Sequence, residues 1–213
     1  MRLRVLSVNP YQENTYLLVA QTGEAWVVDP GLYTAQERAA FAALLEEERA
    51  QLRGIYLTHA HLDHILGVEW VASTYRVPLF FHAAETVVYE HASEWAALMG
   101  LSYTPGPPPT GYIEAGASLD WGGTEVRVLF VPGHSPGHVA FYLPAQGWLL
   151  SGDVLFRGSI GNYQLPLADY TLLMHSLREK VLKLPLETIV WPGHGPDTTI
   201  GHERQTNPFL QTV

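Results

Sequence analysis

The sequence predicts an α/β protein in which β-sheets pack against each other and helices cover them from outside. Short runs of β-branched and aromatic residues, separated by turn residues, occur in both halves of the chain. Longer segments that favour helices lie between these runs. Sheets packed face to face, with helices on their outer faces, bury the apolar side of both kinds of element.

We expect the first half of the chain to begin with antiparallel strands and then to alternate helices with strands. The residues around Val5, 16–19 and 26–28 are β-branched or aromatic and are separated by turn signals. Residues 35–50 predict an amphipathic helix, because apolar residues recur there at helical spacing without Gly or Pro. The pattern then predicts strand 55–57, helix 66–74, strand 79–81 and helix 84–99.

The second half follows a proline-rich segment, residues 104–111, whose composition is typical of a linker or of an extended loop within one domain. We favour a loop beside the functional site, because a domain boundary there would separate the candidate metal ligands described below. A single domain over residues 1–213 is therefore expected. The elements predicted after this segment are strands 126–131, 139–143 and 148–150, helix 170–184 and strand 188–191.

The charge balance of the chain is acidic. It has 12 Lys and Arg residues against 21 Asp and Glu residues, which gives a formal net charge of -9. The only lysines are Lys180 and Lys183, and the arginines are scattered. Neither a nucleic acid nor an anionic membrane surface is expected as a partner.

The chain contains no cysteine. Disulfides, zinc-thiolate sites and a cysteine nucleophile are therefore excluded, and any metal must be held by His, Asp or Glu. The N-terminal residues lack the apolar stretch of a secretory signal, and no apolar run approaches membrane-spanning length. We expect a cytoplasmic protein.

The densest group of metal-ligating residue types lies at residues 58–64, which read Thr-His-Ala-His-Leu-Asp-His. Alternate side chains of an extended segment point the same way, so His59 and His61 can hold one ion. The turn into the next helix would direct Asp63 and His64 to a second ion. Imidazoles and a carboxylate are costly to bury together without a cation. The alternative is a polar helix cap with Asp63 as N-cap, which needs only one such residue.

Three later segments place further ligand types at strand ends. Residues 132–138 contain His134 and His138, Ser-Gly-Asp at 151–153 ends on Asp153, and Pro-Gly-His-Gly at 192–195 contains His194. Each segment carries glycines that let the backbone come close to the site. Loops at one edge of a sheet converge, so these residues are expected to form one site.

Together, these four segments resemble the metallo-β-lactamase superfamily across almost the whole chain. The resemblance implies a four-layer αββα sandwich with a metal site at one edge. It also implies the ligand sets: His59, His61 and His134 for a first metal, Asp63, His64 and His194 for a second, and Asp153 as the bridge between them.

A site of this kind predicts two divalent metal ions. Two cations roughly 3.5 to 4 Å apart share a hydroxide and lower its pKa toward neutrality, so no side-chain nucleophile is required. We expect Asp63 and Asp153 to be catalytic as well as ligating, by orienting this metal-bridging hydroxide. Zinc is the default metal, although His and Asp ligands also accept iron or manganese.

Two further polar residues are expected to support the ligands. Asp29 ends strand 26–28 and resembles an early aspartate of the superfamily that supports a histidine ligand. A Pro-Gly turn residue is the alternative interpretation of Asp29. His138 is expected to be a supporting or core histidine rather than a ligand. The remaining histidines, His82, His91, His175 and His202, match no metal segment and are expected on the surface or in the core.

Within the superfamily, residues 11–16, 155–161 and 207–209 are similar to the short glyoxalase II-like proteins, which are hydroxyacylglutathione hydrolases and their relatives. This resemblance implies a thioesterase acting on S-hydroxyacyl-glutathione or a related small-molecule thioester. Only 19 residues (213 minus 194) follow His194, and none is a lysine that could bind glutathione. Asn162 and Gln164 replace a common Arg and Asp, so the substrate-binding residues and the thiol carrier are left open.

Other functions fit parts of the pattern. A mononuclear iron persulfide dioxygenase needs only His59, His134 and Asp153. A lactonase or another ester hydrolase of the superfamily would use the same hydroxide. A metal-bound scaffold without turnover is a non-enzymatic alternative. The pattern predicts no oligomeric state.

Overall fold

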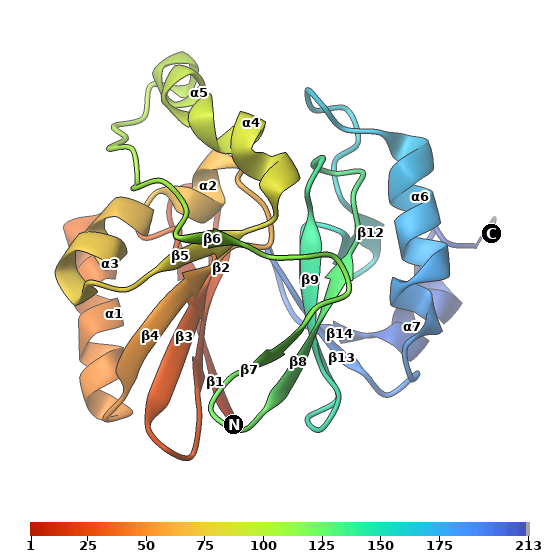
Figure 1. Ribbon diagram of the computed structural model, residues 1–213. Helices are drawn as coiled ribbons and strands as arrows, with labels where there is room; N and C mark the ends of the chain where they lie inside the picture. The colour runs from red at the N-terminus through yellow and green to blue at the C-terminus, as the bar shows by residue number, and fades with distance from the viewer. Residues whose placement is uncertain (212–213) are drawn as a thin grey trace.

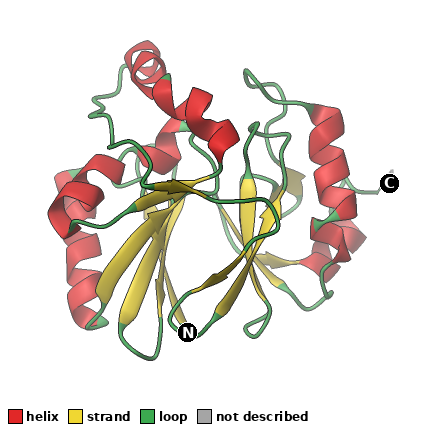
Figure 2. Cartoon of the chain, in the orientation of Figure 1, coloured by secondary structure: helices red, strands yellow, loops and turns green. Residues whose placement is uncertain are grey.

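The structure is a computed structural model that describes residues 1–211. Two six-stranded sheets pack face to face, with helices on their outer faces (Figure 1, Figure 2). The strand order of the first sheet is β1 (Arg2–Val8), β2 (Glu13–Val19), β3 (Glu24–Val28), β4 (Gln51–Tyr56), β5 (Leu79–Phe81) and β6 (Gly111–Tyr112). That of the second is β14 (Thr198–Thr199), β13 (Ile189–Pro192), β10 (Trp148–Gly152), β9 (Val139–Leu143), β8 (Glu125–Phe130) and β7 (Ser118–Asp120).

Helices form the two outer layers, which confirms the predicted αββα sandwich. Figure 1 shows α1 (Ala35–Glu47) and α3 (Val68–Tyr75) outside the first sheet, and α6 (Tyr170–Glu179) and α7 (Ile200–Thr206) outside the second. Three short helices, α2 (Leu62–Ile65), α4 (Thr86–Glu90) and α5 (Ala92–Met99), lie at one end of the sandwich. The remaining elements are the hairpin β11 (Leu155–Phe156) and β12 (Ser159–Ile160) and the 3-10 turns Ala83–Glu85 and Val181–Lys183.

Alternation along the central strands divides the core into three apolar layers. In β2, Tyr16 and Leu18 face the second sheet, whereas Leu17 and Val19 face α1 and α3. In β9, Phe141 packs between the sheets, and its neighbours on either side face α6. Both faces of these strands are buried, which explains why they read as nearly continuous apolar runs.

The strands also determine where the functional residues gather. Strands β3, β4, β5 and β6 are parallel, and so are β10 and β13. Their carboxyl ends therefore lie at one edge of the sandwich. At this edge the Val139 N–H donates a hydrogen bond of 2.8 Å to the Thr58 carbonyl, which joins the second sheet to the segment that follows β4.

The predicted helix 84–99 is wrong in its continuity. It is divided into a 3-10 turn, α4 and α5, with the break at His91. The His91 Nδ1 lies 2.8 Å from the Val87 carbonyl, the acceptor that its own backbone N–H would use in a continuous helix.

Other boundaries also differ from the prediction. The predicted helix 170–184 ends at Glu179, because Lys180 leaves the helical conformation with φ -127° and ψ -59°. The helix predicted over 66–74 begins two residues later, at Val68, and strand β4 runs over 51–56 rather than 55–57. The elements that the sequence pattern did not indicate are α2, β6, β7, β11, β12, β14 and α7.

The proline-rich segment 104–111 connects α5 to β6 and packs behind α4. The Tyr89 hydroxyl donates to the Pro107 carbonyl at 3.0 Å, and Gly106 fits closely against Tyr89 and Val68. No residue of 104–111 lines either of the two cavities described below for the part of the chain that the structure describes. We expected this loop to lie beside the site, and that expectation is wrong. The loop instead packs against α4 through Tyr89 and does not line the cavities.

None of the helices in residues 1–211 is both long and apolar enough to span a bilayer.

The C-terminal helix α7 is held to the β11–β12 hairpin by a buried carboxylate. Glu203 is fully buried and accepts hydrogen bonds from the Gly158 N–H at 2.9 Å and from the Asn207 side chain at 2.8 Å. Asn207 also donates to the Ser159 carbonyl at 3.0 Å. Glu203 and Asn207 thus tie the C-terminal end of α7 to the hairpin that follows Asp153.

Replacing Asn207 by Ala leaves Glu203 and the Ser159 carbonyl without this donor. We expect the free energy of unfolding to fall by about 1 to 3 kcal/mol, the usual cost of an unsatisfied buried polar group. Urea unfolding of Asn207→Ala beside the exposed control Gln205→Ala measures this. Equal midpoints for the two variants would contradict the role given to Asn207.

Candidate metal centre

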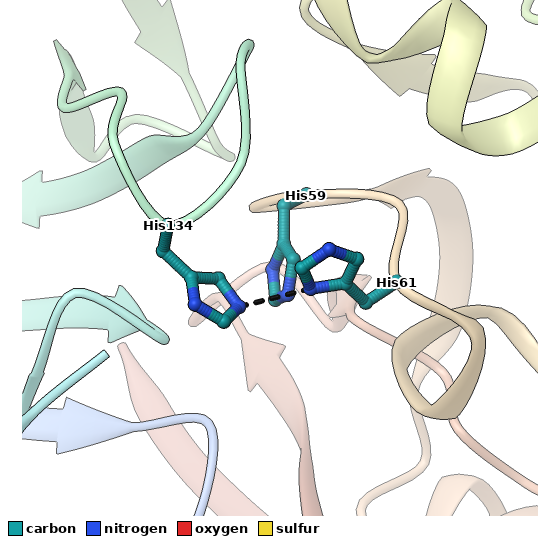
Figure 3. A group of neighbouring side chains, drawn as sticks. All are labelled: His59, His61 and His134. Carbon is teal, nitrogen blue, oxygen red and sulfur yellow. Dashed lines mark hydrogen bonds between the residues drawn. The ribbon is translucent and has the colours of Figure 1, made fainter. Parts of the chain in front are cut away.

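The segments after β4 and β8 bring three histidines together. His59 and His61 follow β4, His134 follows β8, and their side chains point toward one another (Figure 3). One nitrogen from each ring lies within 4.8 Å of the other two. His61 Nδ1 and His134 Nε2 are 2.9 Å apart, so a proton or a cation must lie between them.

A second group forms beside the first. Asp63, His64 and His194 also offer ligand atoms within 4.8 Å of one another. The Asp63 Oδ2 lies 3.1 Å from His194 Nε2 and 3.8 Å from His64 Nε2. Asp63 lies within α2, whose N-cap is His61 and has no side-chain cap bond. The alternative interpretation of Asp63 as a helix cap is therefore wrong.

Asp153, at the end of β10, lies between the two groups. Its Oδ1 is 3.4 Å from His64 Nε2, and its Oδ2 is 3.5 Å from His134 Nε2 and 3.6 Å from His194 Nε2. Gly193 allows this position, because a Cβ there would lie 2.1 Å from the Asp153 Oδ1. Each carboxylate oxygen of Asp153 thus faces at least one histidine, and together they face both groups.

Asp29 orients ligands of both groups from behind. It accepts hydrogen bonds from the Thr58 N–H at 2.7 Å, the Thr58 hydroxyl at 2.6 Å and His64 Nδ1 at 3.1 Å. Because the Thr58 proton points to Asp29, its oxygen accepts from His59 Nδ1 at 3.0 Å. The Nε2 lone pairs of His59 and His64 are thereby directed to the site.

Backbone carbonyls orient two more histidines in the same way. His134 Nδ1 donates to the Asn162 carbonyl, and His194 Nδ1 donates to the Tyr11 carbonyl, both at 3.0 Å. In each ring the Nε2 faces the site: His134 Nε2 lies toward His61, and His194 Nε2 lies 3.1 Å from the Asp63 carboxylate. The backbone of Asn162 therefore has a role here, although its side chain carries no charge.

The charge distribution favours a cation in this position. Burial opposes protonation of His64, but the carboxylates of Asp153 and Asp63 raise its pKa well above its usual value. In the first group, burial lowers the pKa of His61 to about 3. The first group is thus neutral and rich in lone pairs, whereas the second holds the carboxylate of Asp63 and lies beside that of Asp153, and both attract positive charge.

A further observation indicates that these donor atoms suit metal ions. His59 Nε2, His64 Nε2 and Asp153 Oδ1 are buried and have no hydrogen-bond partner in the structure. Orphaned buried polar atoms are rare, and all three belong to the candidate ligands, with His64 Nε2 3.4 Å from Asp153 Oδ1. Nitrogen and carboxylate donors in such a cluster are the ligands of zinc and of iron or manganese.

His138 supports the centre and does not join either ligand group. It is fully buried, and its Nε2 accepts a hydrogen bond of 3.1 Å from the Asp153 backbone N–H. Its ring stacks on His59 with centroids 4.7 Å apart. The structure thus places His138 and Asp29 where the sequence predicted supporting residues.

Two cavities meet at the centre. The deeper one has a volume of about 480 Å³ and is bounded by α4, α5 and residues 165–167, with His61, Asp63, His134 and Asp153 at its base. The shallower one lies over the β11–β12 hairpin and is lined by His194, Gln164 and Phe209. Asp153 and Asn162 line both. The candidate centre is therefore open to ligands from two sides.

The sequence relation to known proteins agrees with this geometry. A profile of the metallo-beta-lactamase superfamily matches residues 8–194. The chain belongs to the metallo-β-lactamase superfamily. This confirms the family predicted from the four metal-ligating segments and the prediction of a metallo-hydrolase at that level.

Individual members of the superfamily match nearly the whole chain. Hydroxyacylglutathione hydrolase GloC of Haemophilus influenzae is 32% identical, with 100% of this chain and 99% of that protein covered. The crystal structure of TTHA1623 in a di-iron-bound form has 42% identity and a TM-score of 0.87, covering 97% of this chain and 100% of that one. BLEG-1, described as a B3 metallo-beta-lactamase, has 38% identity and a TM-score of 0.91, covering 99% and 100%.

The sequence analysis missed the buried carboxylate of Glu85. It joins the segment that carries His59 and His61 to the segment that carries His134. It accepts hydrogen bonds from the Ala60 N–H at 2.8 Å, the Gly137 N–H at 2.6 Å and the Ser135 hydroxyl. Burial raises the pKa of Glu85, and these hydrogen bonds oppose that effect. Residues far apart in the chain are thus held in register by one side chain.

Other supporting residues were also not predicted. Glu13 is fully buried behind His64, with its Oε1 3.8 Å from His64 Nδ1, and burial raises its pKa. Asn14 donates to the carbonyls of Pro192 and Gly195, which positions the loop of His194. The histidine His91, expected on the surface or in the core, lines the deeper cavity.

The substitution Glu85→Gln tests the clamp between the loops. An amide cannot accept from all of these donors, so we expect about 1 to 3 kcal/mol lower stability and roughly 10- to 100-fold weaker metal affinity. Chemical unfolding and competition with a metal-binding dye measure the two effects. Glu90→Gln, on the exposed side of α4, is the matched control. Metal affinity equal to that of the control would show that Glu85 does not position the ligands.

Proposed function

We propose that the protein is a dinuclear metal-dependent hydrolase that cleaves a small-molecule thioester. The position of Asp153 carries the proposal, because its oxygens face histidines of both candidate ligand groups. A single carboxylate between two such groups suits two cations held close together. Zinc is the expected metal, and iron or manganese suits the same donors.

The residues around Asp153 suit hydrolysis by water. Two cations, when bound by the two ligand groups and Asp153, would supply a hydroxide at neutral pH and would polarise the scissile carbonyl. Burial acts to raise the pKa of Asp63, but the nearby His64 and His194 have the larger effect. The pKa of Asp63 therefore lies below its usual value, and the carboxylate stays ionised. Asp63 lines the deeper cavity, where it can accept the proton of the attacking water and return it to the departing thiolate. Asp153 would orient the same water.

Sequence similarity supports a thioester as the substrate. The Haemophilus influenzae hydroxyacylglutathione hydrolase matches this chain from end to end. The segments that resemble glyoxalase II proteins also contact the candidate centre, since the Tyr11 carbonyl orients His194 and Phe209 lines the shallower cavity. The similarity to BLEG-1 keeps a cyclic amide, a lactone or another ester as alternative substrates for the same chemistry.

A mononuclear dioxygenase is less well supported. It would use His59, His134 and Asp153 and would leave the second group without a function. That group is fully assembled, and the buried His64 Nε2 has no partner without a cation. Because TTHA1623 is known in a di-iron-bound form, iron alone does not identify a dioxygenase. The number of metal ions per chain and the consumption of oxygen distinguish a dioxygenase from a hydrolase.

The first test is metal content and activity in one sample purified without added metal. We expect close to two metal ions per chain and hydrolysis of at least one thioester among S-lactoylglutathione and neutral acyl thioesters. Mass spectrometry of metals and release of free thiol measure these. One iron per chain, with oxygen uptake on glutathione persulfide, would establish the dioxygenase instead. Two metals without turnover of any thioester, ester or lactone would favour the scaffold.

The second test is Asp63→Asn. The amide keeps the shape of the side chain, but it does not take up a proton at neutral pH and carries no negative charge to balance a cation. We expect kcat to fall by about 100-fold or more, the scale of one general acid-base group, and the metal content to fall below two per chain. Asp197→Asn, an exposed aspartate three residues after His194, is the control. Unchanged kcat in both variants would remove Asp63 from the catalytic residues.

A further inference from the structure

The deeper cavity has apolar walls that the metal chemistry does not require. One wall is formed by α4 and α5 and the other by residues 165–167, which face each other across the same end of the molecule (Figure 1). Leu98 is 78% exposed and Leu167 is 59% exposed. Exposed apolar side chains gathered around one opening are typical of a binding site. The apolar wall residues with substantial exposure are Tyr11, Val87, Trp95, Leu98, Met99 and Leu167.

This apolar surface is continuous with the candidate metal centre. His61, Asp63, His134 and Asp153 line the base of the same cavity. A molecule whose carbonyl group lies at Asp153 can therefore extend an adjoining apolar chain between α5 and residues 165–167. The eight residues of α5 extend about 12 Å at 1.5 Å per residue, which gives room for a chain of several methylene groups.

The lining also lacks the charges that an anionic ligand needs. Among residues 1–211, no lysine or arginine lines either cavity. Apart from the candidate ligands, the titratable residues at the deeper cavity are Tyr11, His91 and the carboxylate Glu94. The protein as a whole has a formal charge of -9. The carboxylates of a glutathione carrier or the phosphates of a nucleotide carrier would find no counter-charge here.

We propose that the deeper cavity binds the acyl part of the substrate, and that this acyl part is an uncharged, apolar chain of several carbons. The inference rests on the proposed thioesterase function for the bond that is cleaved. In that reaction water adds to the carbonyl carbon, a C–O bond forms, the C–S bond breaks, and the water proton passes to the thiolate. The products are a fatty acid of short to medium length and a free thiol.

A series of acyl thioesters on one neutral carrier, N-acetylcysteamine, tests the chain. We expect kcat/KM to rise about two- to fourfold per added CH₂ from acetyl to octanoyl, because each buried methylene contributes its transfer free energy. The octanoyl thioester should exceed both the acetyl and the lactoyl thioester by at least tenfold. Equal rates along the series, or a preference for the hydroxyacyl group, would overturn the proposal.

Variants of the wall locate the effect. We expect the double variant Leu98→Ser and Leu167→Ser to lower the octanoyl-to-acetyl ratio of kcat/KM at least fivefold. Both side chains are exposed, so the fold does not depend on them. The control is Leu186→Ser, which is 52% exposed and lies outside both cavities. An unchanged ratio in the double variant would place the chain elsewhere.

Binding without turnover separates this proposal from the function on which it rests. S-octyl and S-methyl thioethers of N-acetylcysteamine cannot be hydrolysed, and calorimetry measures their affinity for the protein as purified. We expect the octyl compound to bind at least tenfold more tightly, and the double variant to reduce this difference. Tight octyl binding without turnover of any thioester would reject the thioesterase and retain the acyl site. Turnover with equal affinity for both thioethers would reject the acyl site alone.

Discussion

The hydrogen bonds between Asp29 and Thr58 are the interaction on which the arrangement of the candidate centre depends. They join the ends of two parallel strands, β3 and β4, and they use both oxygens of one buried carboxylate. Through Thr58 the carboxylate orients His59, and directly it orients His64. One side chain thus determines the direction of lone pairs in both ligand groups. Because Asp29 is buried and directly follows β3, its side chain is held in this position.

Most of the buried ionisable groups around the centre face a group of opposite charge or a hydrogen-bond partner, which offsets the cost of burying them. The neutral histidines of the first group face one another, whereas the second group and Asp153 place carboxylates around His64 and His194. Glu85 uses the N–H groups of both ligand segments. Among the candidate ligands, the buried atoms without a hydrogen-bond partner are His59 Nε2, His64 Nε2 and Asp153 Oδ1. The fold therefore concentrates its electrostatic cost at the point where a cation would relieve it.

The sequence predicted the features that depend on local patterns. The long strands and the ligand segments at their ends were recognisable because apolar runs and motif spacing are local properties. Glu85 and the carbonyl of Asn162 were missed, since their roles come from residues about 25 to 50 positions away. The break at His91 arises from a side chain that competes for a helical acceptor. Strands of two residues, such as β6 and β11, are too short for alternation to reveal.

The ligand groups draw on both halves of the chain, and this has a consequence for folding. His59 and His61 follow a strand of the first sheet, while His134, Asp153 and His194 follow strands of the second. A cation held between them would act as a reversible cross-link closing a loop from residue 59 to residue 194, in a protein that has no disulfides. The complete ligand set exists only after the sheets have docked. Metal uptake would therefore report completion of folding, and partly folded chains would compete poorly for scarce ions.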